Sequence, residues 1–163
     1  MTPSLALSLT VNPTLAYLST LGIPSDGRAR QMLLAIGAQE SGFTYRRQVG
    51  GPARGFWQFE SGGGVKGVLT HAATKAVARR VCTDLVVPAA QADVYSVLDQ
   101  NDVLACAFAR LLLWSDPKAL PDTEDGGWDL YTRTWRPGKP HRERWVASWA
   151  AAKVALAGLA TSA

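Results

Sequence analysis

One carboxylate stands out because it closes an apolar helical stripe. Apolar residues recur at helical spacing over positions 29–36, and Glu40 continues the same stripe. Ser41-Gly42 then supplies a helix terminator, so Glu40 is expected in the last turn on the inward face. Burial and the negative end of a helix both raise the pKa of a carboxyl group. Such a group can act as a general acid near neutral pH, whereas the competing interpretation is a glutamate that faces solvent.

A glycine-rich stretch follows from Gly42 to Gly67, and it carries more residues suited to a binding site. Ser41 and Gln58 have short polar side chains that can orient an acid or hydrogen-bond a ligand. Ser41 also fits plain helix capping. Among the dense aromatic residues, most are expected in the core, with Trp57 lining a cleft.

Two further residues complete the set. Glu60 is the other carboxylate of the loop region, and it is either a second acid or a solvated loop charge. Tyr131 lies far along the chain; its hydroxyl can donate to the acid, or the residue is simply a core tyrosine.

The order of these residues resembles a known signature. Gln39-Glu40-Ser41-Gly42-Phe43, followed by Gly55-Phe56-Trp57-Gln58, is similar to the pattern of lytic transglycosylases and goose-type lysozymes of the lysozyme-like superfamily. In that family a helix ends in Glu-Ser and a glycine-rich stretch leads to Gly-Leu-Met-Gln, so Phe56-Trp57 replaces Leu-Met here. The resemblance covers about the middle quarter of the chain. Tyr131 falls where the family places a tyrosine in a late helical segment.

The resemblance implies a fold and an activity. The fold would be mainly α (α+β) and lysozyme-like, with a small glycine-rich β-hairpin or loop after the catalytic helix. The activity would be cleavage of the bond between N-acetylmuramic acid and N-acetylglucosamine in peptidoglycan, with Glu40 as the general acid and base. The residues expected to contact substrate are Ser41, Trp57, Gln58, Glu60 and Tyr131.

The route after protonation distinguishes two kinds of enzyme. In a transglycosylase the C6 hydroxyl of the muramic acid attacks, whereas in a muramidase water attacks. We favour the first, because single-acid enzymes of this superfamily work without a protein nucleophile and Glu60 precedes a run of glycines. The expected partner is the glycan strand of peptidoglycan, with no cofactor, and the protein is expected to be a monomer.

The N-terminus and the length of the apolar runs indicate where the protein is expected to act. The N-terminus is apolar without a basic region, and no run approaches the length of a membrane span. We therefore expect a protein made in the cytoplasm without a signal peptide and not inserted in a membrane. Together with the resemblance, this predicts a bacteriophage or prophage lysin that reaches the wall by phage-type release or virion delivery.

Composition sets the class of protein and leaves one alternative function. The 163 residues, 47% hydrophobic and 18% charged, are typical of one compact domain over 1–163. The net charge of +4 favours a polyanionic partner such as nucleic acid, an anionic membrane or the acidic wall. Basic residues interleaved with tryptophan between Arg133 and Arg144 leave open a non-catalytic wall- or nucleic-acid-binding module. In a wall enzyme this cluster would suit the carboxylates of peptide stems, and no nucleic acid would be needed.

The elements that must position these residues are predicted to be helices. After a loose start, helices are expected at Thr14–Leu21, 25–40, Thr70–Cys82, Pro88–Leu98, Asp102–Trp114 and around Trp145 and Trp149. A turn-rich segment is expected at Ser115–Gly127.

The two cysteines, Cys82 and Cys106, fall in apolar helical stretches and are expected to be buried free thiols. No His-Glu-x-x-His or Cys-x-x-Cys spacing occurs, so no metal site is predicted.

Overall fold

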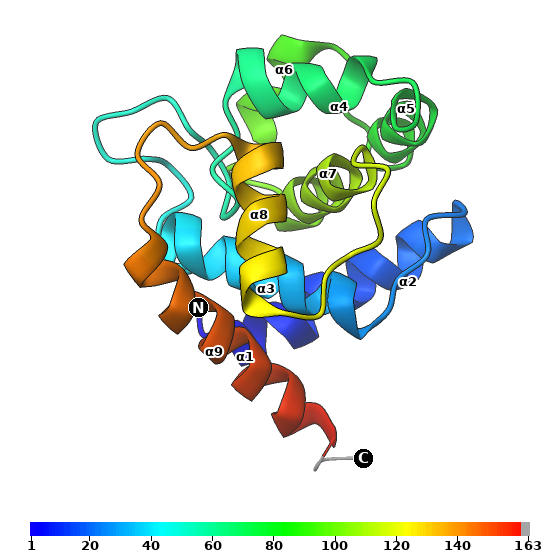
Figure 1. Cartoon of the computed structure of the whole chain (residues 1–163). Coiled ribbons are helices and arrows are strands. Elements are labelled where there is room, and N and C mark those ends of the chain that lie inside the picture. The colour runs from blue at the N-terminus through cyan, green and yellow to red at the C-terminus, as the bar shows by residue number, and fades with distance from the viewer. Residues whose placement is uncertain (161–163) are drawn as a thin grey trace.

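The computed structural model describes residues 1–160, and its regular elements are helical (Figure 1). In chain order they are α1 Pro3–Ala6, the π-helical turn η1 Leu7–Val11, α2 Asn12–Thr20, α3 Gly27–Ser41, the π-helical turn η2 Ser61–Val65, α4 Lys66–Thr70, α5 Lys75–Asp84, α6 Gln91–Val97, α7 Asp102–Trp114, α8 Glu124–Trp135 and α9 Arg142–Ala160. Over the described residues, β pairing is limited to isolated bridges. The prediction of a mainly α protein is confirmed.

Helix α3 forms the middle of the molecule, with α9 packed along it and α8 crossing it (Figure 1). A carboxylate oxygen of Asp26 caps its first turn by accepting from the Ala29 amide at 3.0 Å. Gly42, at φ 59°, ends the helix in the left-handed conformation that favours glycine. Residues 31–37 are all buried, so the helix is enclosed and its C-terminal turn is held in place.

The first residues of the chain are helical, and the prediction of a loose start is wrong. Thr2 caps α1 by accepting from the Leu5 amide, and Pro3 occupies the first turn, where proline is favourable. Leu7 and Val11 of η1 are fully buried. Tertiary packing of these side chains therefore stabilises a segment whose own helical signal is weak.

The stretch after α3 is a loop rather than a hairpin within the part of the chain that the structure describes. Its β pairing consists of the single bridges Arg47↔Arg54 and Arg54↔Phe59. The side chains of Arg47 and Arg54 also form ion pairs with the carboxylate of Asp99, just before α7. Ion pairs to the turn between α6 and α7 thus help to stabilise this loop, which has no strand ladder.

The glycine run 62–64 lies in η2, so its prediction as a loop is wrong. A Cβ on Gly64 would lie 2.5 Å from the ring of Phe59, so this glycine allows η2 to pack closely on the aromatic ring. Val65 and Val68 are fully buried beside it. Packing therefore overrides the low helix propensity of glycine.

Helix α8 begins at Glu124, inside the segment Ser115–Gly127 that was predicted to be turn-rich. The hydroxyl of Thr123 caps it by accepting from the Gly126 amide at 3.2 Å. A Cβ on Gly127 would lie 2.4 Å from Trp149, so glycine here allows α8 to approach α9 closely. This close approach sets the position of Tyr131 of α8 over α3.

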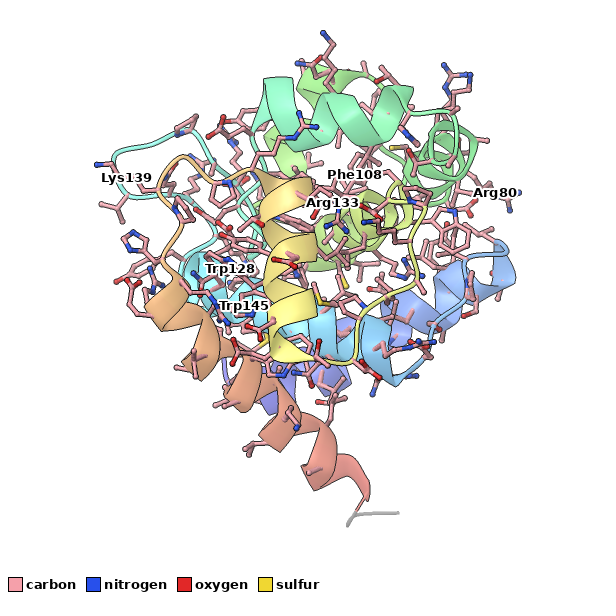
Figure 2. All side chains as sticks on the ribbon, viewed as in Figure 1. Arg80, Phe108, Trp128, Arg133, Lys139 and Trp145 are labelled. Carbon is pink, nitrogen blue, oxygen red and sulfur yellow. The ribbon has the colours of Figure 1, made fainter. Side chains whose placement is uncertain are left out.

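Aromatic side chains fill the space between α8 and α9. Trp128 and Trp145 lie together there, with ring centroids 5.9 Å apart (Figure 2). Cys82 and Cys106 are buried and unbridged, as predicted. No helix among the described residues has the length and apolar character needed to cross a bilayer.

Candidate active site

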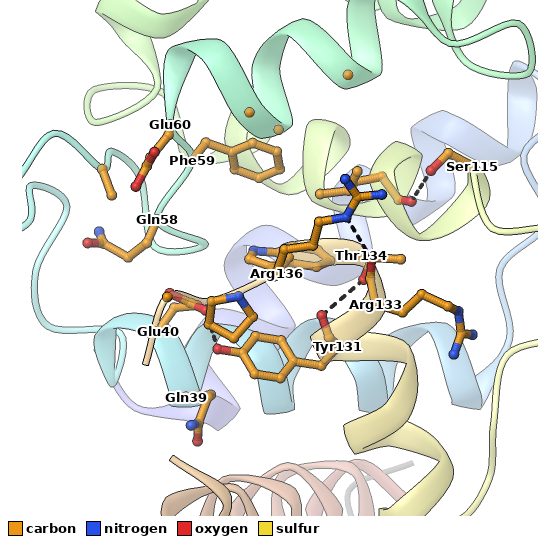
Figure 3. Close-up of a pocket in the computed structure, with 18 of the residues that line it drawn as sticks. Gln39, Glu40, Gln58, Phe59, Glu60, Ser115, Tyr131, Arg133, Thr134 and Arg136 are labelled. Carbon is orange, nitrogen blue, oxygen red and sulfur yellow. Dashed lines mark hydrogen bonds between the residues drawn. The ribbon is translucent and has the colours of Figure 1, made fainter. Parts of the chain in front are cut away.

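A groove of about 1310 Å³ runs beside the C-terminal end of α3 (Figure 3). Five parts of the chain line it: the end of α3, the loop over 48–60, the segment from η2 through α4 to His71, the end of α7 with the turn 115–117, and α8 with the segment 136–144 that follows. These parts are far apart in sequence, so the groove exists only in the folded chain.

Glu40 lies on the floor of this groove, partly buried in the last turn of α3. The phenol of Tyr131 donates a hydrogen bond to its Oε1 at 2.6 Å, drawn as a dashed line in Figure 3. Burial raises the pKa of Glu40 from 4.5 to about 7, opposed by this hydrogen bond and by the charge of Arg144. The carboxyl therefore exchanges its proton near neutral pH, which is the property expected of a general acid and base.

Tyr131 is buried and held by aromatic neighbours. Its ring stacks on Trp145 with a centroid distance of 5.2 Å and an interplanar angle of 11°. Burial and the neighbouring Glu40 raise the pKa of the Tyr131 phenol, so it keeps its proton and remains a donor. Trp145 is itself anchored, because its indole N–H donates to the Glu124 carbonyl at 3.0 Å.

Ser41 is buried and does not line the groove, so the prediction that it contacts substrate is wrong. Its hydroxyl donates to the Phe56 carbonyl at 2.8 Å and accepts from the Phe43 amide at 3.1 Å. The side chain is buried and ties the glycine-rich loop to the helix end. Its role is the capping one that the sequence left open.

Trp57 is fully buried, so the prediction that it lines the cleft is also wrong. Its indole N–H donates to the Leu33 carbonyl at 2.9 Å, and its ring packs edge-on against Phe43. The loop around it is irregular and lacks the alternation of a strand, so sequence position could not indicate the direction of its side chain. The groove is lined by the aromatic residues Phe59, Tyr131 and Trp135.

Gln58 and Glu60 line the groove from the glycine-rich loop (Figure 3). Gln58 has a left-handed backbone at φ 49°, and its amide nitrogen donates to the Gly55 carbonyl at 2.7 Å. Its side-chain oxygen accepts no hydrogen bond from the described residues and can serve a ligand. The Glu60 carboxylate is exposed, with no hydrogen-bond or ion-pair partner in the described part of the chain.

Two charged residues of the groove were not among the site residues predicted from the sequence. Asp116 lies in the segment before α8 and pairs with Arg133 at 2.6 Å, which lowers the pKa of its carboxyl. Arg144 lies in the first turn of α9 and donates to the Gln39 carbonyl at 3.1 Å. Arg144 belonged to the basic cluster, but no sequence pattern indicated that it would lie near Glu40.

The basic cluster divides into paired and unpaired charges. Arg133 pairs with Asp116, and Arg142 pairs with two carboxylates of the first turn of α8. The unpaired cations that line the groove include Arg136, Lys139 and Arg144, since no carboxylate of the described residues pairs with them. Three or more metal-ligating side chains do not come together anywhere in residues 1–160.

The groove therefore collects four of the six residues selected from the sequence: Glu40, Gln58, Glu60 and Tyr131. No family model, curated protein or solved structure matches this chain. The chemistry of the groove is accordingly inferred from its own residues.

Proposed function

We propose that this protein cleaves the β-1,4 bond between N-acetylmuramic acid and N-acetylglucosamine in peptidoglycan, in the manner of a lytic transglycosylase. The observation that carries the proposal is the Glu40 carboxyl, whose pKa is raised to about 7 within a large open groove. A glycosidic oxygen is a poor leaving group until it is protonated. A half-buried acid at the floor of a groove that admits a polymer meets this need.

The reaction would run through one acid. Glu40 donates its proton to the glycosidic oxygen as the bond from that oxygen to C1 of the muramic acid breaks. The C6 hydroxyl of the same sugar then bonds to C1 and gives its proton to the Glu40 carboxylate. No water is consumed, the acid is restored, and the product ends in a 1,6-anhydro ring.

The other groove carboxylates are poorly suited to a second catalytic role. Glu60 is exposed and no described residue orients it, whereas catalytic groups need positioning within about 0.5 Å. Asp116 is already paired with Arg133 and bound to the Lys118 amide at 3.0 Å. Both observations favour a nucleophile supplied by the substrate, whose internal hydroxyl has a high effective concentration.

The charge of the groove fits an acidic polymer. The unpaired cations Arg136, Lys139 and Arg144 can attract the carboxylates of the peptide stems carried by muramic acid. Capture of the polymer would then be electrostatic, while bond cleavage depends on Glu40.

Mass spectrometry of fragments released from isolated wall tests this proposal. Fragments with 1,6-anhydromuramic ends support it. Reducing muramic ends that take up labelled oxygen from water would replace it with a hydrolytic muramidase. Wall binding without fragment release would replace it with a non-catalytic binding module.

Glu60→Gln provides a matched test of the one-acid route. We expect this variant to keep a substantial fraction of wall cleavage and to give the same anhydro ends. A loss as complete as that of Glu40→Gln would show that a second carboxylate takes part.

A further inference from the structure

The C-terminal turn of α3 is bound to the start of α9 through the residue that precedes the acid. The amide nitrogen of Gln39 donates to the His141 carbonyl, and its side-chain oxygen accepts from the Ser148 hydroxyl, both at 3.1 Å. The backbone carbonyl of Gln39 accepts from a guanidinium nitrogen of Arg144 at 3.1 Å. Gln39 is buried, so these three contacts fix α9 relative to Glu40.

The contact from Arg144 has an electrostatic consequence. The last carbonyls of a helix lack intrahelical partners and carry its negative partial charge. Arg144 satisfies one of them beside Glu40 and brings a full positive charge to this end of α3. Because its acceptor is a neutral carbonyl, that charge is not cancelled.

Arg144 differs in this respect from two other arginines of the same region. Arg133 and Arg142 are held by carboxylates, which neutralise them. Arg144 forms no ion pair with any described residue, Glu40 included. A directly paired cation typically lowers a carboxyl pKa by about 1–3 units, which would leave Glu40 ionised at neutral pH and unable to donate a proton.

Other charged groups line the same groove. Glu60 and Lys66 contribute from the loop and α4, Arg136 and Lys139 from the segment before α9, and the paired Asp116 and Arg133 from beside α8. The imidazoles of His71 and His141 line it as well. From the helices packed on the end of α3, Tyr131 and Arg144 are the groups that act on the carboxyl of Glu40.

We infer that Arg144 is a positioning residue for the reaction, whose guanidinium stabilises the ionised carboxylate of Glu40 after it has donated its proton. This inference rests on the proposed function. Glu40 must be neutral when the glycosidic bond breaks and charged when the C6 hydroxyl gives up its proton. A nearby, unpaired cation favours the second state without abolishing the first.

The test is the pH profile of wall cleavage for Arg144→Gln and Arg144→Lys. Glutamine is polar but carries no charge, whereas lysine keeps the charge. In Arg144→Gln the basic limb of kcat/KM should move upward by about 0.5–1 pH unit, less than a directly paired charge would produce, and kcat should fall. In Arg144→Lys the limb should stay near that of the unaltered protein.

Lys139→Gln is the matched control, because it removes one unpaired charge from the same groove. We expect its basic limb to stay in place even where its KM rises. If the basic limb of the kcat/KM profile does not move in Arg144→Gln and only KM rises, Arg144 is a substrate-binding residue and the inference is overturned. Equal shifts in the glutamine and lysine variants would overturn it as well.

A second readout separates this inference from the proposed function. The Glu40 carboxyl can be titrated directly by carbon NMR of protein labelled at glutamate side chains, with Glu40→Gln assigning the signal. An upward shift of its pKa in Arg144→Gln supports the coupling even if no wall is cleaved. An unchanged titration overturns the coupling even if the protein proves to be a transglycosylase.

Discussion

The phenol of Tyr131 and the carboxyl of Glu40 are joined by a hydrogen bond of 2.6 Å, although 91 positions separate them in the chain. Tyr131 is fixed by its stack on Trp145, and Glu40 by the enclosed helix α3. The contact therefore joins two rigid elements at the floor of the groove. It also couples the proton of the acid to a phenol that stays protonated, because the pKa of Tyr131 is raised.

Replacing Glu40 with glutamine should abolish wall cleavage and preserve the fold. The amide is nearly isosteric and can still accept from Tyr131, but it cannot supply a proton. General acid catalysis is typically worth about 10²–10⁴-fold, so a loss of at least that order is expected in turbidity clearing of isolated wall. Half of the original activity in a folded Glu40→Gln variant would rule out Glu40 as the acid.

The same substitution should change how stability depends on pH. The pKa of Glu40 rises from 4.5 to about 7 on folding, so the folded state binds this proton more tightly than the unfolded state. The stability of the unaltered protein should therefore fall, through this group, as pH rises from about 4.5 to about 7. One pKa unit corresponds to about 1.4 kcal/mol. At pH 8 the free energy of unfolding of Glu40→Gln should therefore exceed that of the unaltered protein by on the order of 2–4 kcal/mol through this group.

Urea unfolding of both proteins at pH 5 and pH 8 measures this difference. Glu60→Gln serves as the control, because its carboxylate is exposed and no described residue pairs with it. A stability difference between Glu40→Gln and the unaltered protein that stays constant with pH would contradict the burial of this charge.

Tyr131→Phe should slow cleavage without unfolding the protein. The ring keeps its stack on Trp145, and only the hydrogen bond to Glu40 is lost. Hydrogen bonds to charged groups contribute about 1.5–3 kcal/mol, so a decrease in kcat/KM of roughly 10-fold or more is expected. Because this bond lowers the pKa of Glu40, its loss should also move the basic limb of the pH profile upward.

Tyr17→Phe is the control for this variant. Tyr17 donates to the Asp84 carboxylate at 2.8 Å, so the substitution removes the same kind of bond outside the groove. Its wall cleavage and pH profile should match those of the unaltered protein. Identical losses in Tyr17→Phe and Tyr131→Phe would show that the effect is not specific to Glu40.

Wall binding should weaken as salt is raised, because the Debye length shrinks from about 10 Å at 0.1 M to about 3 Å at 1 M. Lys139→Gln should bind less tightly and with a smaller salt dependence in sedimentation assays with isolated wall. Arg142→Gln should mainly lower the melting temperature, since Arg142 already pairs with Glu124 and Asp125. Binding that does not change with salt would exclude electrostatic capture.

Two glycines of the groove wall should respond oppositely to alanine. In Gly64→Ala the new Cβ would lie 2.5 Å from the Phe59 ring, so the melting temperature should fall. Gly67 lies in α4 with no heavy atom within 4 Å of the position of such a Cβ, so alanine should stabilise that helix by up to about 1 kcal/mol. Thermal unfolding of the two variants checks the contrast, and equal destabilisation would contradict it.

The sequence alone was sufficient to predict a helix where its apolar period, its cap or its terminator can be recognised locally. The predicted helix Asp102–Trp114 has those bounds as α7, and Asn101 caps it by accepting from the Leu104 amide at 3.0 Å. The apolar stripe and Gly42 likewise predicted the last turn of α3 and the inward face on which Glu40 lies. Periodicity, a cap and a left-handed terminator all act within a few residues of one another, so they can be recognised without the fold.

The tertiary structure alone decided which side chains meet. Trp57 turned into the core and Ser41 onto the Phe56 carbonyl, because an irregular loop has no period from which side-chain direction can be predicted. The partners of Glu40, namely Tyr131 and Arg144, come from α8 and α9, and their approach depends on the packing of Gly127 against Trp149. Even the pKa of Glu40 required the fold, because burial and neighbouring charges are properties of the assembled groove and not of the helix that carries the acid.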